Sequence, residues 1–393
     1  MTMNDLKSKF SLNADIITPS DGYHYFFGYY DMRADDGSGR HLCHRVSFID
    51  RLPREDDIAE VGYVKDKVFH KIGETSAWNF QQGAMLQYHP TEKDTVYYNI
   101  RRNTDIVTVT HNFATGAKSF TDRACACVSP DGKYGLAVNF ARIYDFRPGY
   151  GYAGISDSSA DMNAPHNDGV FLVDTKKGVS RQILHYDTLA IAAGFEKDEK
   201  VLVNHITFNP ASDKYIMLVR SFPAPERPWR TSLVCGDLDG NIKTLFAKTY
   251  ASHYCWVDDN NIVIHCTADN YSDPFSENRS MYIINVITGE FAEHRIPYFD
   301  IPGGGDIHCN VSPDGKYIIG DGYPKAGMRP LLAYSLKTGE SHMLFEAKTI
   351  EPDIIDIRCD LHARFISGKK ISFDTTHNGR REIACISTDM LDF

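Results

Sequence analysis

Two patterns of apolar and polar positions alternate along the chain. In the first, an apolar run enters a turn and a second run leaves it, as at 124–138 (ACACVSPDGKYGLAV), 205–219 (HITFNPASDKYIMLV) and 308–322 (HCNVSPDGKYIIGDG). In the second, two runs flank a polar turn, as in VFLVDTKKGVSRQI and LLAYSLKTGESHML. Pro, Asp and Gly between β-branched or aromatic runs are typical of hairpin turns. Each pattern therefore predicts a β-hairpin.

The alternation of the two hairpins predicts a four-stranded repeat. A first hairpin followed by a second makes one blade of a propeller, and such repeats recur every forty to fifty residues or so. Four histidines, His205, His253, His308 and His362, stand at one phase of the repeat, at intervals of 48, 55 and 54 residues. Each interval has room for four strands with their turns.

Earlier copies bring the predicted blades to seven. Cys125 and Met85 occupy the same phase as the histidines, and a further blade opens near residue 24. We expect one all-β domain over residues 1–393, a seven-bladed β-propeller with four-stranded antiparallel blades. The last blade lacks an outer strand after IACISTDM, so we expect residues 13–20 to pair with it and help close the ring.

One interval is too long for a blade. The 80 residues from Cys125 to His205 contain a single outer hairpin, and the surplus is assigned to an insertion at about 141–168, rich in Gly, Tyr, Asp and Pro. Long structured insertions on a rigid scaffold often cap an active face. A packing loop between blades is the equal alternative.

Composition narrows the function classes. A formal net charge of −10 without a basic run argues against nucleic-acid or anionic-membrane partners, and an anionic substrate would need a local basic site. The N-terminus lacks a signal-like apolar core, and no stretch approaches the ~18 apolar residues of a membrane span, so we expect a cytoplasmic enzyme. Nine cysteines without framework spacing indicate reduced, mostly buried thiols. The sequence does not fix the oligomeric state.

The phased histidines carry the candidate chemistry. Equivalent positions of consecutive blades converge on the propeller axis, so the four imidazoles are expected to share one pocket. Asp306 with His308, and Asp360 with His362, are each two residues apart and lie on one face of an extended strand. Imidazoles with a carboxylate suit manganese, iron or zinc, whereas an all-oxygen calcium cage would not need histidines. We predict a divalent metal held by His308, Asp360 and His362.

These segments resemble the oligogalacturonate lyases, cytoplasmic seven-bladed propellers that cleave short pectic uronides by β-elimination with manganese. SHYCW at 252–256 resembles the segment with the catalytic base, which implies that role for His253. GDIHCNVSPDGKYIIGDG and CDLHARF resemble the segments with metal ligands, which implies His308 and His362. The resemblance covers most of the chain. It implies an acidic oligosaccharide as substrate and Mn²⁺ as the metal, with Zn²⁺, Fe²⁺ and Ca²⁺ as alternatives.

The chain departs from that family at two places. Asp360 stands where the family has a histidine, and the family's catalytic arginine aligns near Ser232. We expect Arg230 or Arg220 to replace that arginine, and Arg364 is a third candidate partner for a substrate carboxylate, because a guanidinium grips a carboxylate bidentately. The departures indicate a divergent uronide-lyase-like group.

The chemistry is coherent by itself. Elimination removes a weakly acidic proton next to a carboxylate, and a metal or an arginine on that carboxylate stabilises the charge. His253 is the predicted base, since imidazole titrates near neutral pH. Tyr25 or Tyr29 is a candidate proton donor to the leaving group. The predicted substrate-binding residues, each with core filling as its alternative, are His205, His24, Tyr25, Gln82 and Arg364.

Two other functions stay open at this point. A glycoside hydrolase would use paired carboxylates such as Asp306 and Asp360. A carbohydrate- or protein-binding propeller without chemistry would leave the phased histidines unexplained. Elimination yields a conjugated product that absorbs in the ultraviolet, and hydrolysis does not.

Overall fold

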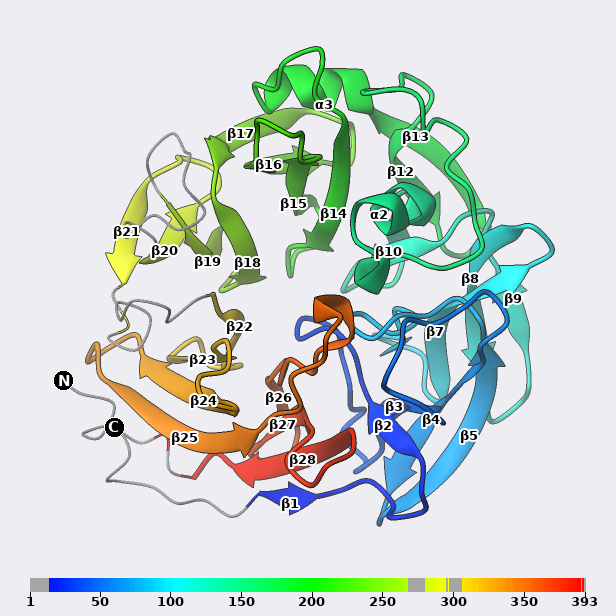
Figure 1. Cartoon of the computed structure of the whole chain (residues 1–393), viewed down its shortest axis with the longest axis vertical. Coiled ribbons are helices and arrows are strands. Elements are labelled where there is room, and N and C mark those ends of the chain that lie inside the picture. The colour runs from blue at the N-terminus through cyan, green and yellow to red at the C-terminus, as the bar shows by residue number, and fades with distance from the viewer. Residues whose placement is uncertain (1–13, 268–279, 295, 297–305, 390, 392–393) are drawn as a thin grey trace.

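The computed structural model describes residues 14–267, 280–294, 296, 306–389 and 391. Their strands form seven four-stranded antiparallel sheets arranged as a ring (Figure 1). The predicted seven-bladed β-propeller is confirmed.

Six blades are formed by consecutive strands, and the seventh combines both ends of the chain. Blade one comprises β2 (His24–Phe26), β3 (His41–Val46), β4 (Ala59–Lys65) and β5 (Val68–Thr75). Blade two comprises β6 (Gln87–Tyr88), β7 (Thr95–Arg102), β8 (Asp105–Asn112) and β9 (Lys118–Phe120). Blade three comprises β10 (Cys125–Val128), β11 (Tyr134–Ala137), β12 (Gly169–Asp174) and β13 (Val179–His185). Blade four comprises β14 (Val201–Phe208), β15 (Lys214–Ser221), β16 (Thr231–Asp237) and β17 (Ile242–Thr249). Blade five comprises β18 (Ala251–Trp256), β19 (Asn261–Cys266), β20 (Ser280–Asn285) and β21 (Phe291–His294). Blade six comprises β22 (His308–Val311), β23 (Tyr317–Asp321), β24 (Met328–Ser335) and β25 (Ser341–Lys348). Blade seven comprises β26 (Arg364–Ile366), β27 (Lys370–Thr375), β28 (Glu382–Ser387) and β1 (Asp15–Ile16). The helical segments are α2 (Phe140–Phe146), η1 (Pro148–Tyr150), α3 (Tyr186–Ala192) and η2 (Ile355–Ile357).

The ring closes through strand β1. Asp15 lies opposite Cys385 and Ile16 opposite Ala384, so the start of the described chain supplies the outer strand of the last blade. This strand lies within the range 13–20, where the sequence places the missing partner. Closure in this way pairs an edge that would otherwise be exposed.

Blade packing explains why inner strands are almost continuously apolar. In β15, Ile216 and Leu218 belong to a core shared with blade five, whereas Met217 and Val219 point to the opposite face and join the large core of the first four blades. Alternate residues of a strand point to opposite faces, and both faces of a blade are covered by neighbouring blades.

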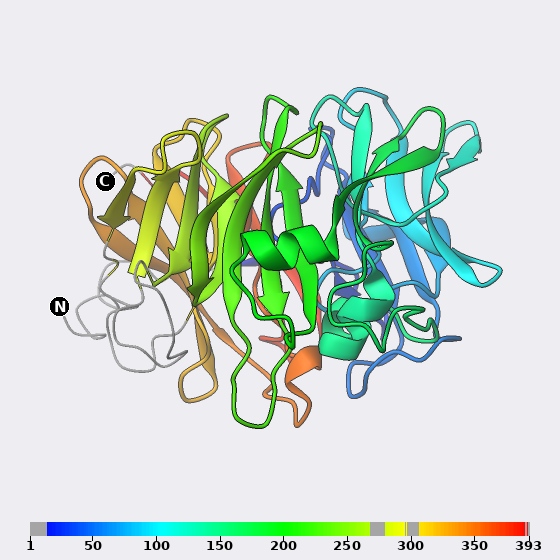
Figure 2. The ribbon, with the colours of Figure 1, turned by 90° about the horizontal axis from the view of Figure 1, so that it is seen from above.

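The insertion follows β11 and is fixed to blade four. Asn139 caps the N-terminus of α2, and its side chain accepts a hydrogen bond from the Arg142 backbone N–H. The Arg142 guanidinium is fully buried, lies 2.9 Å from Asp157 Oδ2 and donates at 2.7 Å to the carbonyl of Val201, in the first residue of β14. Figures 1 and 2 show α2 and η2 close together on one face of the ring, where η1 and η2 are in contact.

Two sequence expectations concern the whole chain. The nine cysteines are all free, and eight of them are buried, with Cys255 the partly exposed exception. Among the described residues, no helix has both the length and the apolar character needed to span a bilayer.

Candidate functional site

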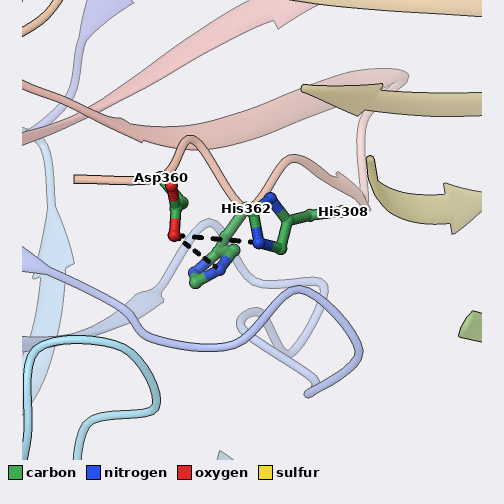
Figure 3. Close-up of side chains that lie close together, drawn as sticks. All are labelled: His308, Asp360 and His362. Atoms are coloured by element: carbon green, nitrogen blue, oxygen red, sulfur yellow. Dashed lines mark ion pairs between the residues drawn. The ribbon is translucent and has the colours of Figure 1, made fainter. Parts of the chain in front are cut away.

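Three side chains from two neighbouring blades converge close to the axis of the ring. His308 begins β22, and Asp360 and His362 lie on the segment between η2 and β26. Asp360 Oδ2 lies 3.7 Å from His308 Nε2 and 3.9 Å from His362 Nε2, and the three potential ligand atoms lie within 4.8 Å of one another (Figure 3). The fold thus brings together the three residues predicted from the sequence as metal ligands.

The atoms that face one another carry unused hydrogen-bonding capacity. His308 Nε2, Asp360 Oδ2 and His362 Nε2 are buried without a hydrogen-bond partner among the described residues. Buried polar atoms nearly always have a hydrogen-bond partner. Three neighbouring atoms without one therefore indicate a binding site for a ligand or ion. Two imidazole nitrogens and a carboxylate oxygen form a donor set for a divalent transition metal. The residues therefore fit such a cation.

Each of the two imidazoles is held in place by a contact of its Nδ1, the ring nitrogen that faces away from Asp360. His308 Nδ1 lies 2.9 Å from Asp321 Oδ1, and His362 Nδ1 lies 2.9 Å from the carbonyl oxygen of Gly28. Both partners only accept, so each Nδ1 carries a proton and Nε2 is the nitrogen turned toward Asp360. Burial would lower the pKa of His308, but the Asp321 and Asp360 carboxylates raise it, so a metal ion at Nε2 would have to displace a proton there. His362 has a φ of +44°, a left-handed conformation that costs about 1 kcal/mol or more for a non-glycine residue.

Two arginines flank Asp360. Arg358 Nη2 lies 2.7 Å from Asp360 Oδ2, outside hydrogen-bond geometry, and Arg329 Nη2 lies 2.9 Å from Oδ1. Burial by itself would raise the pKa of Asp360, but these guanidiniums hold it well below its usual range. Asp360 is consequently an ionised carboxylate.

His253 forms a dyad with Asp306 beside this cluster. Its ring centroid is 4.0 Å from that of His308, and its Nδ1 lies 2.9 Å from Asp306 Oδ2. The carboxylate also accepts a hydrogen bond from Tyr250 Oη at 3.2 Å and lies 3.2 Å from His265 Nδ1. Burial lowers the pKa of His253 to about 4, against the raising effect of Asp306. The imidazole is therefore neutral at pH 7, with its Nδ1 directed to Asp306.

A cavity opens next to the dyad. Its wall is rich in aromatic and basic side chains from blades four to six, the N-terminal segment and the insertion. The lining side chains that bear on the chemistry are Tyr29, Arg147, Tyr150, Asn204, Arg220, Trp229, Tyr250, His253, Asp306 and Tyr323.

Arg220 is the cation of this cavity that has no carboxylate partner among the described residues. The side chain is buried, its Nε has no hydrogen-bond partner, and its guanidinium packs on the Trp229 ring at 4.6 Å. Arg230, the other arginine predicted for this role, is ion-paired with the buried Glu199 and does not line the cavity. The geometry favours Arg220 over Arg230, since a paired guanidinium is already satisfied.

Tyr29 and Tyr30 separate His205 from the other three phased histidines. The ring centroid of Tyr30 is 5.8–6.0 Å from all four phased histidine rings, so this residue fills the axis that they surround. His205 Nε2 lies 2.7 Å from Asp31 Oδ2, and with Gln82 it lines a second cavity. Tyr29 lines both cavities. The expected single pocket is thus divided, with His205 and Gln82 apart from the dyad and the metal cluster.

Three further predicted residues lie outside both cavities. The ring of His24 packs beside Arg381, whose backbone N–H donates to its Nδ1 at 3.4 Å, and Tyr25 Oη donates to Asp21 at 2.7 Å. Arg364 Nη2 donates to the carbonyl of Gly28 at 3.2 Å, the same oxygen that His362 contacts. For His24, Tyr25 and Arg364 the geometry therefore supports structural roles in place of substrate binding.

The sequence left a cap over the active face and a packing loop as equal alternatives for the insertion, and it pointed to none of the insertion's residues. Arg147 and Tyr150 extend from it into the cavity wall, and Arg147 is ion-paired with Asp356 of η2 at 2.6 Å. Both residues lie outside the repeated strands, so comparing equivalent positions of the blades does not identify them. Asp321 was also missed, although it lies directly opposite His308 in the β22–β23 hairpin, and that register could have been read from the turn.

No protein-family model matches the chain, and no curated protein matches it by sequence. Comparison of folds is informative. The chain is similar to a structure of an oligogalacturonate lyase in complex with manganese, with 14% identity, a TM-score of 0.66, and coverage of 97% of this chain and 98% of the other. The likeness is distant. A seven-bladed propeller is what the two share.

Peptidase propellers are similar to the chain as well. The tricorn protease gives 11% identity and a TM-score of 0.54 over 97% of this chain and 36% of its own. A puromycin-hydrolyzing peptidase of Mycobacterium tuberculosis gives 10% identity and a TM-score of 0.54 over 96% and 56%. Identities this low relate folds and not activities, so function has to be argued from the site.

Proposed function

We propose that this protein is a lyase that cleaves uronic-acid-containing oligosaccharides by metal-assisted β-elimination. The observation that carries the proposal is the placement of Arg220, a buried cation without a carboxylate partner among the described residues, in one cavity with a carboxylate-oriented neutral imidazole, His253. The two groups supply what elimination requires, a partner for the substrate carboxylate and an acceptor for the neighbouring proton.

Arg220 would bind the uronate carboxylate. A guanidinium in a buried wall gains a charge-assisted pair when an anion enters, because it has no competing carboxylate among the described residues. Charge that develops on the carboxylate as the adjacent carbon loses its proton is stabilised by the same pair. Arg220 therefore contributes to binding and to the reaction.

His253 would act as the base. The Nδ1 of His253 faces Asp306 Oδ2 at 2.9 Å, and a proton kept on that nitrogen leaves the Nε2 lone pair to accept a proton from the substrate carbon. The carboxylate then stabilises the imidazolium that forms, as an orienting acid does in other dyads. The partly exposed Trp229 and the phenols of the wall give a sugar ring apolar surface for stacking.

His308, Asp360 and His362 would hold the divalent metal. A bound cation at this cluster would supply Lewis-acid stabilisation of a substrate oxygen. The two imidazoles are held in the orientation this needs by Asp321 and by the Gly28 carbonyl. Manganese is the metal of the similar lyase structure, and we extend it to this chain as the first metal to test.

The paired-carboxylate hydrolase is less well supported. A hydrolase of that kind needs one carboxylic acid with a raised pKa. The pKa values of Asp306 and Asp360 are both held well below the usual range, in opposition to burial, by His253 for Asp306 and by Arg358 for Asp360. Neither carboxyl group is protonated at neutral pH, so neither serves as the acid.

A screen of acidic oligosaccharides tests the proposal. Purified protein with Mn²⁺ is expected to give products that absorb in the ultraviolet and whose masses sum to that of the substrate. His253→Ala is expected to abolish the signal, whereas His166→Ala, on an exposed histidine, is expected to leave it unchanged. Products whose masses include an added water would identify hydrolysis and contradict the proposal.

A further inference from the structure

Four tyrosines line the cavity that contains Arg220 and His253, namely Tyr29, Tyr150, Tyr250 and Tyr323. Elimination leaves an alkoxide on the departing sugar, and sugar alkoxides are poor leaving groups unless they are protonated. A phenol in the cavity wall can supply that proton. The four phenols differ in what surrounds their oxygen.

Tyr150 is the phenol whose oxygen is bound by a cation. Arg358 Nη2 donates a hydrogen bond to Tyr150 Oη at 3.1 Å, and the Arg147 guanidinium carbon lies 4.7 Å from the centre of the Tyr150 ring. With a lone pair engaged by Arg358, the hydroxyl proton points elsewhere. Two neighbouring guanidiniums stabilise the phenolate that remains after proton donation.

The other phenols are less suited to give up a proton. Tyr250 Oη already donates to the Asp306 carboxylate at 3.2 Å, and the negative acceptor disfavours a phenolate. Tyr29 and Tyr323 have no hydrogen bond from a guanidinium among the described residues, and burial raises the pKa of both above the ordinary tyrosine value.

Tyr150 is also held firmly in place. It ends η1 in the insertion, where Gly149 packs so closely on η2 that a Cβ there would lie 2.6 Å from the Cβ of Asp356. The Gly149 backbone N–H donates to Asp356 Oδ2 at 3.3 Å, and Arg147 is paired with the same carboxylate. The insertion therefore fixes the phenol relative to the segment that carries Asp360.

We propose that Tyr150 is the proton donor to the leaving oxygen, an assignment that rests on the proposed lyase function. His253 takes the proton next to the carboxylate, and the C–H electron pair forms the C=C bond. The C–O bond to the departing sugar breaks with its electron pair on oxygen, which receives the Tyr150 hydroxyl proton. Arg358 stabilises the phenolate. After product release, solvent returns a proton to Tyr150 and removes one from His253, so the enzyme is regenerated.

The test compares two leaving groups in the full chain. One substrate is a uronyl disaccharide, which departs as a sugar alkoxide, and the other is the same uronate with fluoride at that carbon, which departs without a proton. Tyr150→Phe is expected to lower kcat/KM for the disaccharide by about 10²–10⁴-fold and to leave fluoride release within about tenfold of the wild type. Tyr323→Phe is the matched control, with equal effects on the two substrates.

Each other outcome overturns the assignment. Equal losses on both substrates in a folded Tyr150→Phe protein would give Tyr150 a structural role only, and a selective loss in Tyr29→Phe would make Tyr29 the donor. Wild-type protein that eliminates neither substrate would overturn the proposed function itself, and the role of Tyr150 with it.

A second variant covers the case in which Tyr150→Phe does not fold. Replacement of Tyr150 by 3-fluorotyrosine keeps the hydroxyl and increases its acidity. The alkaline limb of the pH–rate profile for the disaccharide is then expected to move to lower pH, while the profile for the fluoride stays in place. An unmoved limb for the disaccharide would overturn the assignment.

Discussion

Asp321 stands behind His308, with its Oδ1 2.9 Å from Nδ1 of the imidazole. Its other oxygen accepts a hydrogen bond at 2.7 Å from the backbone N–H of Leu361, between Asp360 and His362. One carboxylate therefore orients a candidate ligand of blade six and the segment that carries the other two. Partners of this kind commonly change metal affinity by about 10–100-fold when they are removed.

We predict that Asp321→Asn weakens Mn²⁺ binding by about 10–100-fold, as measured by calorimetry, because an amide has one accepting oxygen for the two donors, His308 Nδ1–H and the Leu361 N–H, that Asp321 serves. Asp314→Asn removes an exposed carboxylate of the same blade and is the control, with unchanged affinity. Equal affinities in the two variants would show that Asp321 does not support a metal ligand.

Metal binding is expected to stabilise the fold. A ligand that binds only the folded state at 100 times its Kd adds about 2.7 kcal/mol to the free energy of unfolding, so chelation should lower the Tm. His362→Asn removes an imidazole while keeping a residue that tolerates the positive φ, and it should abolish this metal-dependent shift. A shift that survives in His362→Asn would place the metal elsewhere.

Arg220 and Arg230, the two candidates for the arginine that binds the substrate carboxylate, should respond differently to substitution by lysine. Arg220→Lys is expected to reduce kcat/KM for a uronide at least about tenfold, because lysine cannot form the bidentate pair with a carboxylate. Arg230→Lys keeps the ion pair with Glu199 and is expected to retain activity. Steady-state kinetics on the two variants make the comparison, and the reverse ranking would contradict the assignment of Arg220.

The insertion should depend on its buried ion pair. Arg142→Met leaves Asp157 buried without its partner and is expected to cost about 3 kcal/mol or more in the free energy of unfolding, measured by urea denaturation. Lys133→Met, at an exposed pair, should cost less than about 1 kcal/mol. Similar small losses in both would mean that the insertion is not anchored through Arg142.

Repeats are why the sequence predicted the fold and the metal cluster. His308 and His362 are 54 positions apart, but one phase of the repeat places both beside the axis, and Asp360 follows because it is two residues from His362. The extended strand predicted for Asp360 and His362 was wrong, because both lie on an irregular segment ahead of β26 and His362 has a positive φ. The seven blades follow from the same periodicity of hairpins.

What lay outside the repeat was not predictable in this way. Tyr30 fills the axis from a segment ahead of β3, and it separates His205 from the other histidines. Arg364 packs against that same segment, where its Nη2 donates to the Gly28 carbonyl, and it lines neither cavity. Tyr150 reaches the cavity from an insertion whose path no periodicity describes. Each case depends on where an irregular segment packs, which strand patterns do not encode.

Metal dependence of elimination tests the central claim most directly. Protein stripped with a chelator would be incubated with a cleavable uronide oligosaccharide, and the ultraviolet absorbance of the product followed as Mn²⁺ is added. The account predicts no product without metal and full activity near one equivalent in the wild type, with no recovery in His362→Asn. Equal rates with and without metal would contradict it.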